Sequence, residues 1–104
     1  MYGTIRRYES TDKTRTSEVV DKVKDDLVPK LSELPGFSGY FLIEGANGVM
    51  SSVSFFDTAA HAEESTQVAS NWVRDSELEK ALPNAPKITI GEVLVHETRE
   101  LVQA

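Results

Sequence analysis

The stretch that decides the fold runs from residue 34 to residue 57 and reads LPGFSGYFLIEGANGVMSSVSFFD. Leu34-Pro35-Gly36 is typical of the end of a helix, because a glycine can adopt the positive φ often found there. Two runs rich in aromatic and β-branched residues, Phe37 to Glu44 and Val49 to Asp57, predict strands. The Asn47-Gly48 pair between them is a strong signal for a hairpin turn. The centre of the chain is therefore expected to form two antiparallel strands.

Helices are predicted on both sides of this hairpin. From Ser17 to about Leu34, apolar residues recur every three or four positions with charged residues between them, which indicates an amphipathic helix. Pro29 removes a backbone donor inside this segment, so we expect a kink or break just before it. After the hairpin, Asp57 or Thr58 is expected to cap a second amphipathic helix that runs to about Asp75.

Strands at the two ends complete the pattern. Tyr2 to Glu9 and Lys87 to His96 are both predicted to be strands, and Ser76 to Leu82 has helical character up to Pro83. The order β-α-β-β-α-β is the ferredoxin-like pattern of an α+β protein, a four-stranded antiparallel sheet with both helices on one face. We expect residues 1–104 to form a single domain of this kind.

The second face of this sheet would have no helices over it. Both hairpin strands carry apolar residues on both faces, most clearly at Phe55 and Phe56, whereas a sheet face in contact with water is usually polar. A large exposed apolar patch usually marks an interface. We therefore expect a homodimer in which two sheets pack face to face, as in a dimeric α+β barrel.

Composition limits the classes of function. The 104 residues include 11 Lys and Arg against 17 Asp and Glu, a net charge of −6, which argues against binding of nucleic acid. The chain has no cysteine, so disulfides, thiolate metal sites and a cysteine nucleophile are excluded. No apolar run approaches the roughly 20 residues of a membrane span, and the first residues do not resemble a signal peptide. A cytoplasmic protein with no membrane partner is expected.

Three motifs in this order resemble a known family. They are residues 34–40 after the first helix, Ser52-Val53-Ser54-Phe55-Phe56-Asp57 before the second, and Gly91-Glu92-Val93 in the last strand. From Tyr2 to Glu97 the chain resembles the antibiotic biosynthesis monooxygenase (ABM) domain proteins of the dimeric α+β barrel superfamily. The superfamily includes cofactor-independent oxygenases of aromatic polyketides and haem-degrading enzymes. The resemblance implies a ligand pocket inside each protomer, between the helices and the sheet.

The resemblance also suggests site residues. Several enzymes of the family use an Asn and a Trp in the pocket, which implies roles for Asn71 and Trp72. It further implies a substrate carbanion that reacts directly with O₂, so no cofactor is expected. Neither His61 nor His96 lies in a motif of the haem-degrading branch, and no haem site is inferred. No spacing of His and carboxylates in the sequence indicates a metal site.

The second predicted helix carries a possible pocket wall. His61, Ser65, Val68 and Trp72 follow the i, i+4, i+7, i+11 spacing of one helix face. Histidine is a suitable proton shuttle near neutral pH. The alternative is that Trp72 is an anchor of the core and His61 an exposed residue of the first turn.

Two adjacent arginines, Arg6 and Arg7, occupy a strand that this topology makes central. Their side chains must point to opposite faces of the sheet, one toward the helices and one toward the dimer interface. A buried guanidinium needs a partner, for which Glu92 is the obvious candidate and Glu44 a weaker one. One of the arginines could instead hold a substrate anion or enolate. The alternative is a structural ion pair.

These residues support two main hypotheses. The first is a small homodimeric ABM-type monooxygenase in which His61 or Asn71 assists deprotonation of an aromatic or enolisable substrate. The second is a non-catalytic ligand-binding or stress-associated dimer, and a third possibility is a dimer with a filled core. The catalytic candidates are His61, Asn71, Trp72 and Arg7, and the substrate-binding candidates are Arg6, Tyr40, Phe55, Phe56, Ser65 and Val68.

Overall fold

The computed structural model describes residues 1–99, so the last five residues of the predicted domain lie outside the described range. Four strands and a layer of helices alternate along the chain in the predicted order. The short segment Lys13–Arg15 is a 3₁₀ turn, and Val23–Leu27 is a π-helical turn. The main elements are β1 (Tyr2–Tyr8), α1 (Thr16–Lys22), α2 (Val28–Ser32), β2 (Phe37–Glu44), β3 (Met50–Phe56), α3 (Ala59–Asp75) and β4 (Lys87–Glu92).

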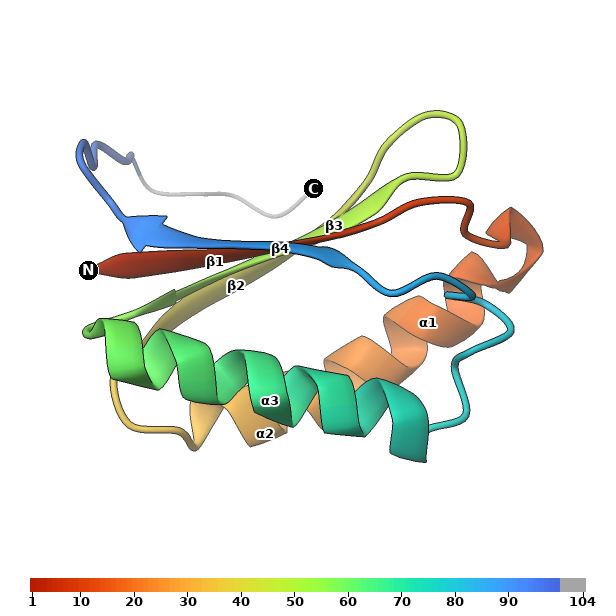
Figure 1. Ribbon diagram of the computed structural model, residues 1–104, viewed down its shortest axis with the longest axis horizontal. Coiled ribbons are helices and arrows are strands. Elements are labelled where there is room, and N and C mark those ends of the chain that lie inside the picture. Colours follow the sequence, from red (N-terminus) through yellow and green to blue (C-terminus); the bar gives the residue numbers. More distant parts are fainter. Residues whose placement is uncertain (100–104) are drawn as a thin grey trace.

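The sheet is antiparallel with strand order β2-β3-β1-β4, and the helices cover only one of its faces (Figure 1). This is the ferredoxin-like α+β arrangement, so the predicted fold class is confirmed. β1 and β3 are the two inner strands, and the side chains of each alternate between the helix face and the open face. Within residues 1–99, no helix is long and apolar enough to span a lipid bilayer.

The first predicted helix is interrupted where its proline suggested. α1 ends at Lys22, a π-helical turn follows, and α2 contains Pro29 in its first turn. Because proline has no N–H and its ring crowds the preceding turn, the residues before it cannot continue regular α-helical hydrogen bonding. The N–H of Val28 instead bonds to the carbonyl of Val23, five residues earlier. The wider turn places Val23 and Leu27 in the core.

Two tight turns have the backbone conformation that their sequences predicted. Asn47 and Gly48 both have positive φ, 60° and 73°, in the hairpin between β2 and β3. Gly36 has a φ of 79° after α2, and a Cβ at this position would overlap the carboxylate of Asp57. Glycine is therefore required there both by the backbone and by the close approach of the two segments.

Two expectations in the C-terminal half are wrong. Ser76 to Leu82 forms turns rather than a helix, because Glu77 adopts a φ of 57° that ends the helical path after α3. This segment still buries apolar side chains in the core. β4 ends at Glu92 rather than His96, because Glu92 already pairs with Tyr2, the first residue of β1. Beyond that point only Met1 remains, and its carbonyl oxygen accepts a hydrogen bond from the N–H of Val93 at 2.9 Å.

The core lies between the sheet and the helices and contains several polar side chains. Its apolar part includes Leu31, Phe56 and Leu78, which are at most 2% exposed. The buried polar residues all face the helix side or belong to α3. They are Thr4, Arg6, Ser52, Ser54 and Ser65.

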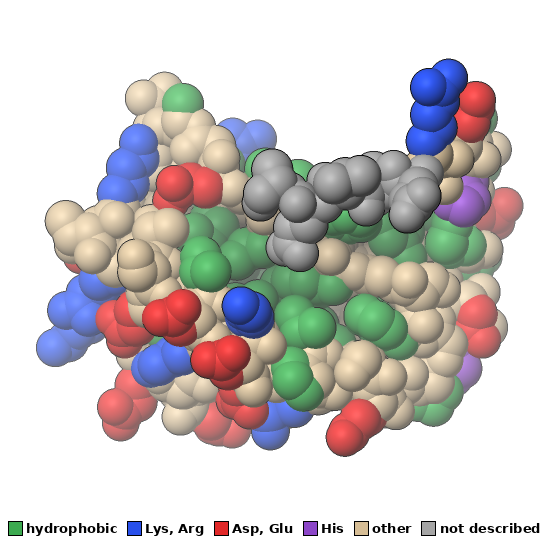
Figure 2. All heavy atoms as spheres, turned by 180° about the vertical axis from the view of Figure 1, so that it is seen from behind, with side chains coloured by type: hydrophobic (Ala, Val, Ile, Leu, Met, Phe, Trp, Pro, Cys, Tyr) green, Lys and Arg blue, Asp and Glu red, His purple; other side chains and the backbone are tan. Residues whose placement is uncertain are grey.

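The open face of the sheet exposes large apolar side chains. Ile5, Phe41 and Ile43 are 44%, 44% and 53% exposed, and the register places all three on this face. Figure 2 views the molecule from the side of β2, edge-on to the sheet, and shows hydrophobic side chains near the centre of that view with charged side chains mainly to the left and below. Such an apolar face is unusual for a surface that stays in contact with water.

Candidate functional site

A small space, here called the inner cavity, lies between the sheet and the helices. About 30 Å³ is open to the centres of water molecules, which is room for roughly two of them. Most of its polar side chains come from the sheet, and its helix side is mostly apolar. The strands contribute Arg6, Tyr8, Tyr40, Ser52 and Ser54 together with the apolar Leu42 and Met50, and the helices contribute mainly Val19, Val23, Leu27, Leu31, Ser65, Ala69 and Trp72.

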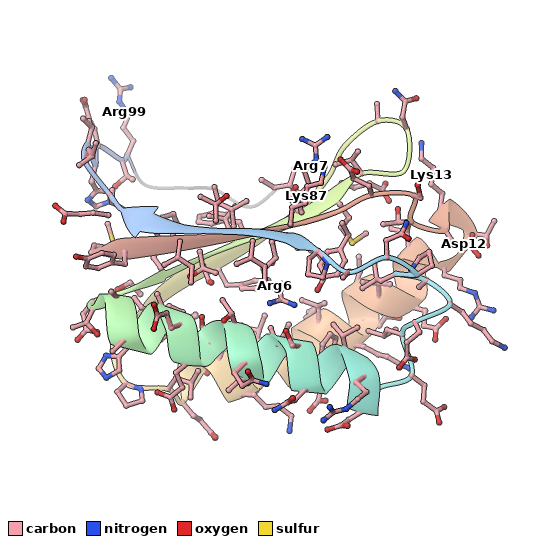
Figure 3. The ribbon with its side chains drawn as sticks, viewed as in Figure 1. Arg6, Arg7, Asp12, Lys13, Lys87 and Arg99 are labelled. Carbon is pink, nitrogen blue, oxygen red and sulfur yellow. The ribbon has the colours of Figure 1, made fainter. Side chains whose placement is uncertain are left out.

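Arg6 is the charged group at the inner cavity. It is only 4% exposed, and Figure 3 shows it projecting from β1 into the space between the sheet and α3. Nη1 donates to the carbonyl oxygen of Thr66 at 3.2 Å, and Nη2 donates to the hydroxyls of Tyr8 at 3.0 Å and Ser70 at 3.2 Å. The guanidinium carbon also lies 5.8 Å from the centre of the Tyr8 ring. These contacts fix the guanidinium against α3.

The expected carboxylate partner of the buried arginine is not there. Glu92 instead accepts a hydrogen bond from the hydroxyl of Tyr2 at 3.4 Å, and Glu44 accepts one from Thr16 at 2.7 Å. The reason is the register, because the residue of β4 opposite Arg6 is Ile88 and Glu92 lies four residues further along. Within residues 1–99, no carboxylate comes within 4.0 Å of the Arg6 guanidinium.

Arg7 points away from the inner cavity. It projects from the open face of the sheet, as does Lys87 opposite it (Figure 3). Its Nε lies 3.4 Å from a carboxylate oxygen of Glu9, and its side chain is 52% exposed. The strand register therefore separates the two arginines, and only Arg6 lies where the predicted pocket is.

Tyr40 contributes a neutral phenol from β2. Burial raises the pKa of Tyr40 to about 12, and a hydrogen bond with Ser52 partly opposes that shift. The phenol therefore keeps its proton at neutral pH and can donate a hydrogen bond into the inner cavity.

Two of the predicted α3 residues reach the inner cavity. Ser65 lines it, although its hydroxyl donates to the carbonyl of Ala62 at 2.6 Å. Trp72 is 5% exposed and forms part of the wall. Its indole Nε1 donates to Oδ2 of Asp26 at 2.6 Å, and Asp26 belongs to the π-helical turn. Sequence reasoning missed Asp26 as the partner of Trp72, because Asp26 lies far away in the sequence and in a turn that is not α-helical.

The other α3 candidates lie outside the inner cavity. His61 is near the beginning of α3, where its Nδ1 is 2.6 Å from Oδ1 of Asp57, and this hydrogen bond lowers the pKa of Asp57. Asn71 and Val68 line a groove of about 340 Å³ on the far side of Trp72. The structure therefore does not bring His61 and Asn71 together with Arg6.

The two phenylalanines of β3 occupy different environments, and neither lines the inner cavity. Phe56 is fully buried and packs edge-to-face on Phe37, with ring centres 5.8 Å apart. Phe55 lies on the open face, where it packs edge-to-face on Phe41 with ring centres 6.3 Å apart. Both act as packing residues in the described structure.

A second space, here called the outer cleft, adjoins the inner cavity beside Arg6. It measures about 380 Å³ and lies between the end of α3 and the segment from Glu79 to Pro86. Arg6, Tyr8 and Leu82 border both spaces. Ser70, which sequence reasoning also missed, lines the outer cleft and helps to hold Arg6. No local pattern in the sequence pointed to it, because the contact joins residues 64 positions apart.

Metal coordination is not indicated by the arrangement of side chains. Among residues 1–99, no three His, Asp or Glu side chains are grouped so that they could hold a metal ion.

Comparisons with known proteins agree on the fold. No protein-family model matches the chain, and no curated protein matches it. A protein of unknown function from Nitrosomonas europaea is similar over 95% of this chain and 94% of its own, with a TM-score of 0.72 and 15% identity. An antibiotic biosynthesis monooxygenase is similar over 91% of this chain and all of its own, with a TM-score of 0.67 and 13% identity. A dimeric ferredoxin-like protein from an uncultured marine organism is similar over 94% of this chain and 97% of its own, with a TM-score of 0.63 and 15% identity.

These similarities define the structural class. The chain has the ferredoxin-like fold of ABM-type proteins, over nearly its full length and that of the matched structures. The resemblance seen in the three sequence motifs is therefore confirmed for the fold. At these identities the comparison concerns the fold, and the activity has to be argued from the site.

Proposed function

We propose that this chain is a cytoplasmic homodimeric protein of ABM type that binds a small aromatic or enolisable molecule between sheet and helices and promotes its oxygenation by O₂. The observation that carries the proposal is the contrast between the two sides of the inner cavity. Polar side chains of the strands face apolar side chains of the helices across a space inside the protomer. A planar molecule with one polar edge matches that contrast.

The cost of burying hydroxyl groups supports a ligand-binding role for the polar side chains of the inner cavity. Burying a hydroxyl without a full set of partners costs on the order of 1–3 kcal/mol in proteins. The chain nevertheless buries three serines, Ser52, Ser54 and Ser65, in the wall of the inner cavity. Apolar residues of similar size would stabilise the fold more, so a ligand-binding role explains the polar choice.

The proposed reaction needs no group from the protein to change its oxidation state. The substrate first loses a proton from an activated C–H bond, and the resulting carbanion is delocalised as an enolate. O₂ forms a new C–O bond with that carbon and takes up one proton, which gives a hydroperoxide. Loss of water from the hydroperoxide, with cleavage of its O–O bond, leaves a carbonyl. One O₂ is consumed and one H₂O released per substrate.

The protein would assist by binding and orienting the enolate. Donors placed where negative charge develops are usually the largest contribution to catalysis of this kind. Tyr40 and Arg6 are such donors at the inner cavity. The residues that line the cavity include no His, Asp or Glu, so the proton of the substrate would pass to water. The substrate must therefore be acidic enough to ionise near neutral pH.

Ligand binding would require the inner cavity to expand. Its present volume accommodates water, whereas sites for drug-sized ligands measure roughly 300–1,000 Å³. The outer cleft is separated from it by side chains that include Leu82. Leu82 belongs to a segment of turns rather than to a helix or strand, so its displacement breaks no regular hydrogen-bond ladder. We propose that the ligand joins the two spaces into one.

The homodimer is supported by the open face of the sheet. The exposed Ile5, Phe41 and Ile43 lie together there, and one similar structure is of a protein named as dimeric. Packing two such faces would remove apolar surface from water, at roughly 25 cal/mol per Å². It would also leave the helix-covered cavity of each protomer free for a ligand.

A second candidate function is binding without catalysis. The observation that favours it is that, among the described residues, no His, Asp or Glu lines the inner cavity. Such a protein would sequester a small molecule in the same site.

Oxygen uptake separates these functions. The protein is incubated in air with anthrone, and O₂ consumption is followed with an electrode. We expect the unaltered protein to consume one O₂ for each substrate molecule. Ser54→Leu, which fills the inner cavity, should lose this activity, and the matched surface variant Ser17→Leu should retain it. A ligand-dependent rise in melting temperature without O₂ uptake would favour the binding protein. The absence of both effects would overturn the proposed site.

A further inference from the structure

We infer that the ligand of this site binds as a monoanion, with an enolate, phenolate or carboxylate oxygen on the Arg6 guanidinium. The inference rests on the proposed function only in that it places the ligand in the same cavity. It does not depend on whether the ligand is oxidised. It is carried by three features of Arg6: its free donors, its uncompensated charge, and the orientation of the hydroxyl groups around it.

The first feature is the number of donors. A guanidinium has five N–H groups. Three of them have acceptors in the structure, one on Nη1 and two on Nη2. The N–H of Nε and the second N–H of Nη1 have no acceptor among the described residues. Nε is not among the fully buried side-chain atoms that lack a partner, so its N–H is open to solvent and hence to a ligand. A ligand oxygen would satisfy donors that the protein leaves open.

The second feature is the charge itself. All three acceptors are neutral oxygens, and no carboxylate among the described residues lines the inner cavity. The outer cleft adds one acid, Glu79, which forms no ion pair with Arg6, and one further base, Arg74. Arg74 is already paired with Asp75 at 3.3 Å and is mostly exposed. Arg6 is therefore the cation that a bound anion would neutralise.

The third feature is the direction of the neighbouring hydroxyl protons. The oxygens of Tyr8 and Ser70 both accept from Nη2 of Arg6, so their own protons cannot point along those bonds. Tyr8 borders both the inner cavity and the outer cleft, and Ser70 borders the outer cleft. Each can donate to an oxygen bound beside the guanidinium. Donors of this kind stabilise an anion and offer little to a ligand that is itself a donor.

The charge balance sets the ligand class. One guanidinium matches one negative charge, and a dianion such as phosphate monoester would bring an unmatched charge into a largely apolar space. The helix side of the cavity is built from Val and Leu side chains, which suit a hydrocarbon ring. The ligand class is therefore an aromatic or fused-ring molecule with a single ionised oxygen group.

The test compares two probes of the same shape. Binding of 2-naphthoate and of its neutral isostere 2-naphthamide is measured by titration calorimetry at pH 7. We expect the carboxylate to bind at least about tenfold more tightly, as a charge-assisted hydrogen bond requires. Arg6→Gln should abolish that preference with little effect on the amide, and Arg6→Lys should retain part of it. Arg15→Gln, which removes a half-exposed positive charge that lines neither space, is the matched control and should bind as the unaltered protein does.

The outcomes separate this inference from the proposed function. Equal binding of the two probes, no binding of the carboxylate, or a preference that survives in Arg6→Gln would each overturn the anion site. The comparison of probes on the unaltered protein stands even if the Arg6 variants do not fold. A carboxylate preference without O₂ uptake on anthrone would support the anion site and contradict the oxygenase. O₂ uptake at an unchanged rate in Arg6→Gln would contradict the anion site and leave the oxygenase standing.

Discussion

Removing the hydroxyl of Tyr40 should change how stability depends on alkaline pH. Burial raises the pKa of this phenol from 10.0 to about 12 in the folded protein. Because the folded state then holds the proton more tightly than the unfolded state, the free energy of unfolding is undiminished below pH 10 and falls as the pH rises toward 12. A pKa difference of about two units, at roughly 1.36 kcal/mol per unit, lowers the free energy of unfolding by about 2.7 kcal/mol in total. About half of that loss has occurred by pH 11.

The assay is urea unfolding at pH 8 and pH 11 of the unaltered protein and of Tyr40→Phe. We expect the unaltered protein to lose about 1.4 kcal/mol more than the variant between the two pH values. The absorbance of phenolate near 295 nm, compared between the same two proteins, gives the pH at which Tyr40 loses its proton. Tyr2→Phe is the control for removing one phenol from the chain. Parallel loss of stability in the unaltered protein and Tyr40→Phe would refute the burial of this phenol at the cavity.

Three further substitutions test the fold, the cavity wall and the open face. Gly36→Ala should lower the free energy of unfolding by at least about 1–2 kcal/mol because of the positive φ at this position. Adding Asp57→Ala should recover the part of that loss that comes from overlap of the new Cβ with the Asp57 carboxylate. An equal loss with and without the Asp57 carboxylate would show that the two side chains do not touch. Asp26→Leu removes the acceptor of the indole N–H, so we expect the emission of Trp72, the chain's single tryptophan, to shift and its quenching by acrylamide to increase; unchanged emission would argue against the bond. Phe41→Lys places a charge on the open face, and we expect sedimentation to change from that of a dimer to that of a monomer; no change would contradict the proposed interface.

Local signals in the sequence predicted most of the fold because each depends on a few neighbouring residues. Pro29 interrupts its helix, and the Asn47-Gly48 pair turns the hairpin, whatever the rest of the chain does. The end of β4 could not be predicted in this way. It depends on where β1 begins, some 90 residues away, and β4 stops where its partner strand stops. Glu77 likewise gives no local signal that it adopts a positive φ.

The candidate site was predicted less well because it depends on register and on distance along a helix. Alternation places Arg6 and Arg7 on opposite faces, but only the observed pairing shows that Arg6 faces the helices. His61 and Trp72 share a face of α3, yet 11 residues at about 1.5 Å each put them roughly 16 Å apart along the axis. A common helix face therefore does not imply a common cavity. Trp72 lines the cavity, while His61 lies at the end of the sheet beside Asp57.

The distribution of carboxylates gives an independent reason to regard the Arg6 site as functional. The chain has six more acidic than basic residues, and several of its surface cations lie beside acids, as Arg7 does beside Glu9 and Lys22 beside Glu18. These exposed pairs contribute little to stability, typically below about 1 kcal/mol. A buried guanidinium gains far more from an acid, because the low dielectric strengthens their attraction. A buried cation without an acid beside it is destabilising, and the proposed binding role would account for that cost. Neutral acceptors there leave the positive charge for a molecule that comes and goes, which is what a binding site for an anion requires.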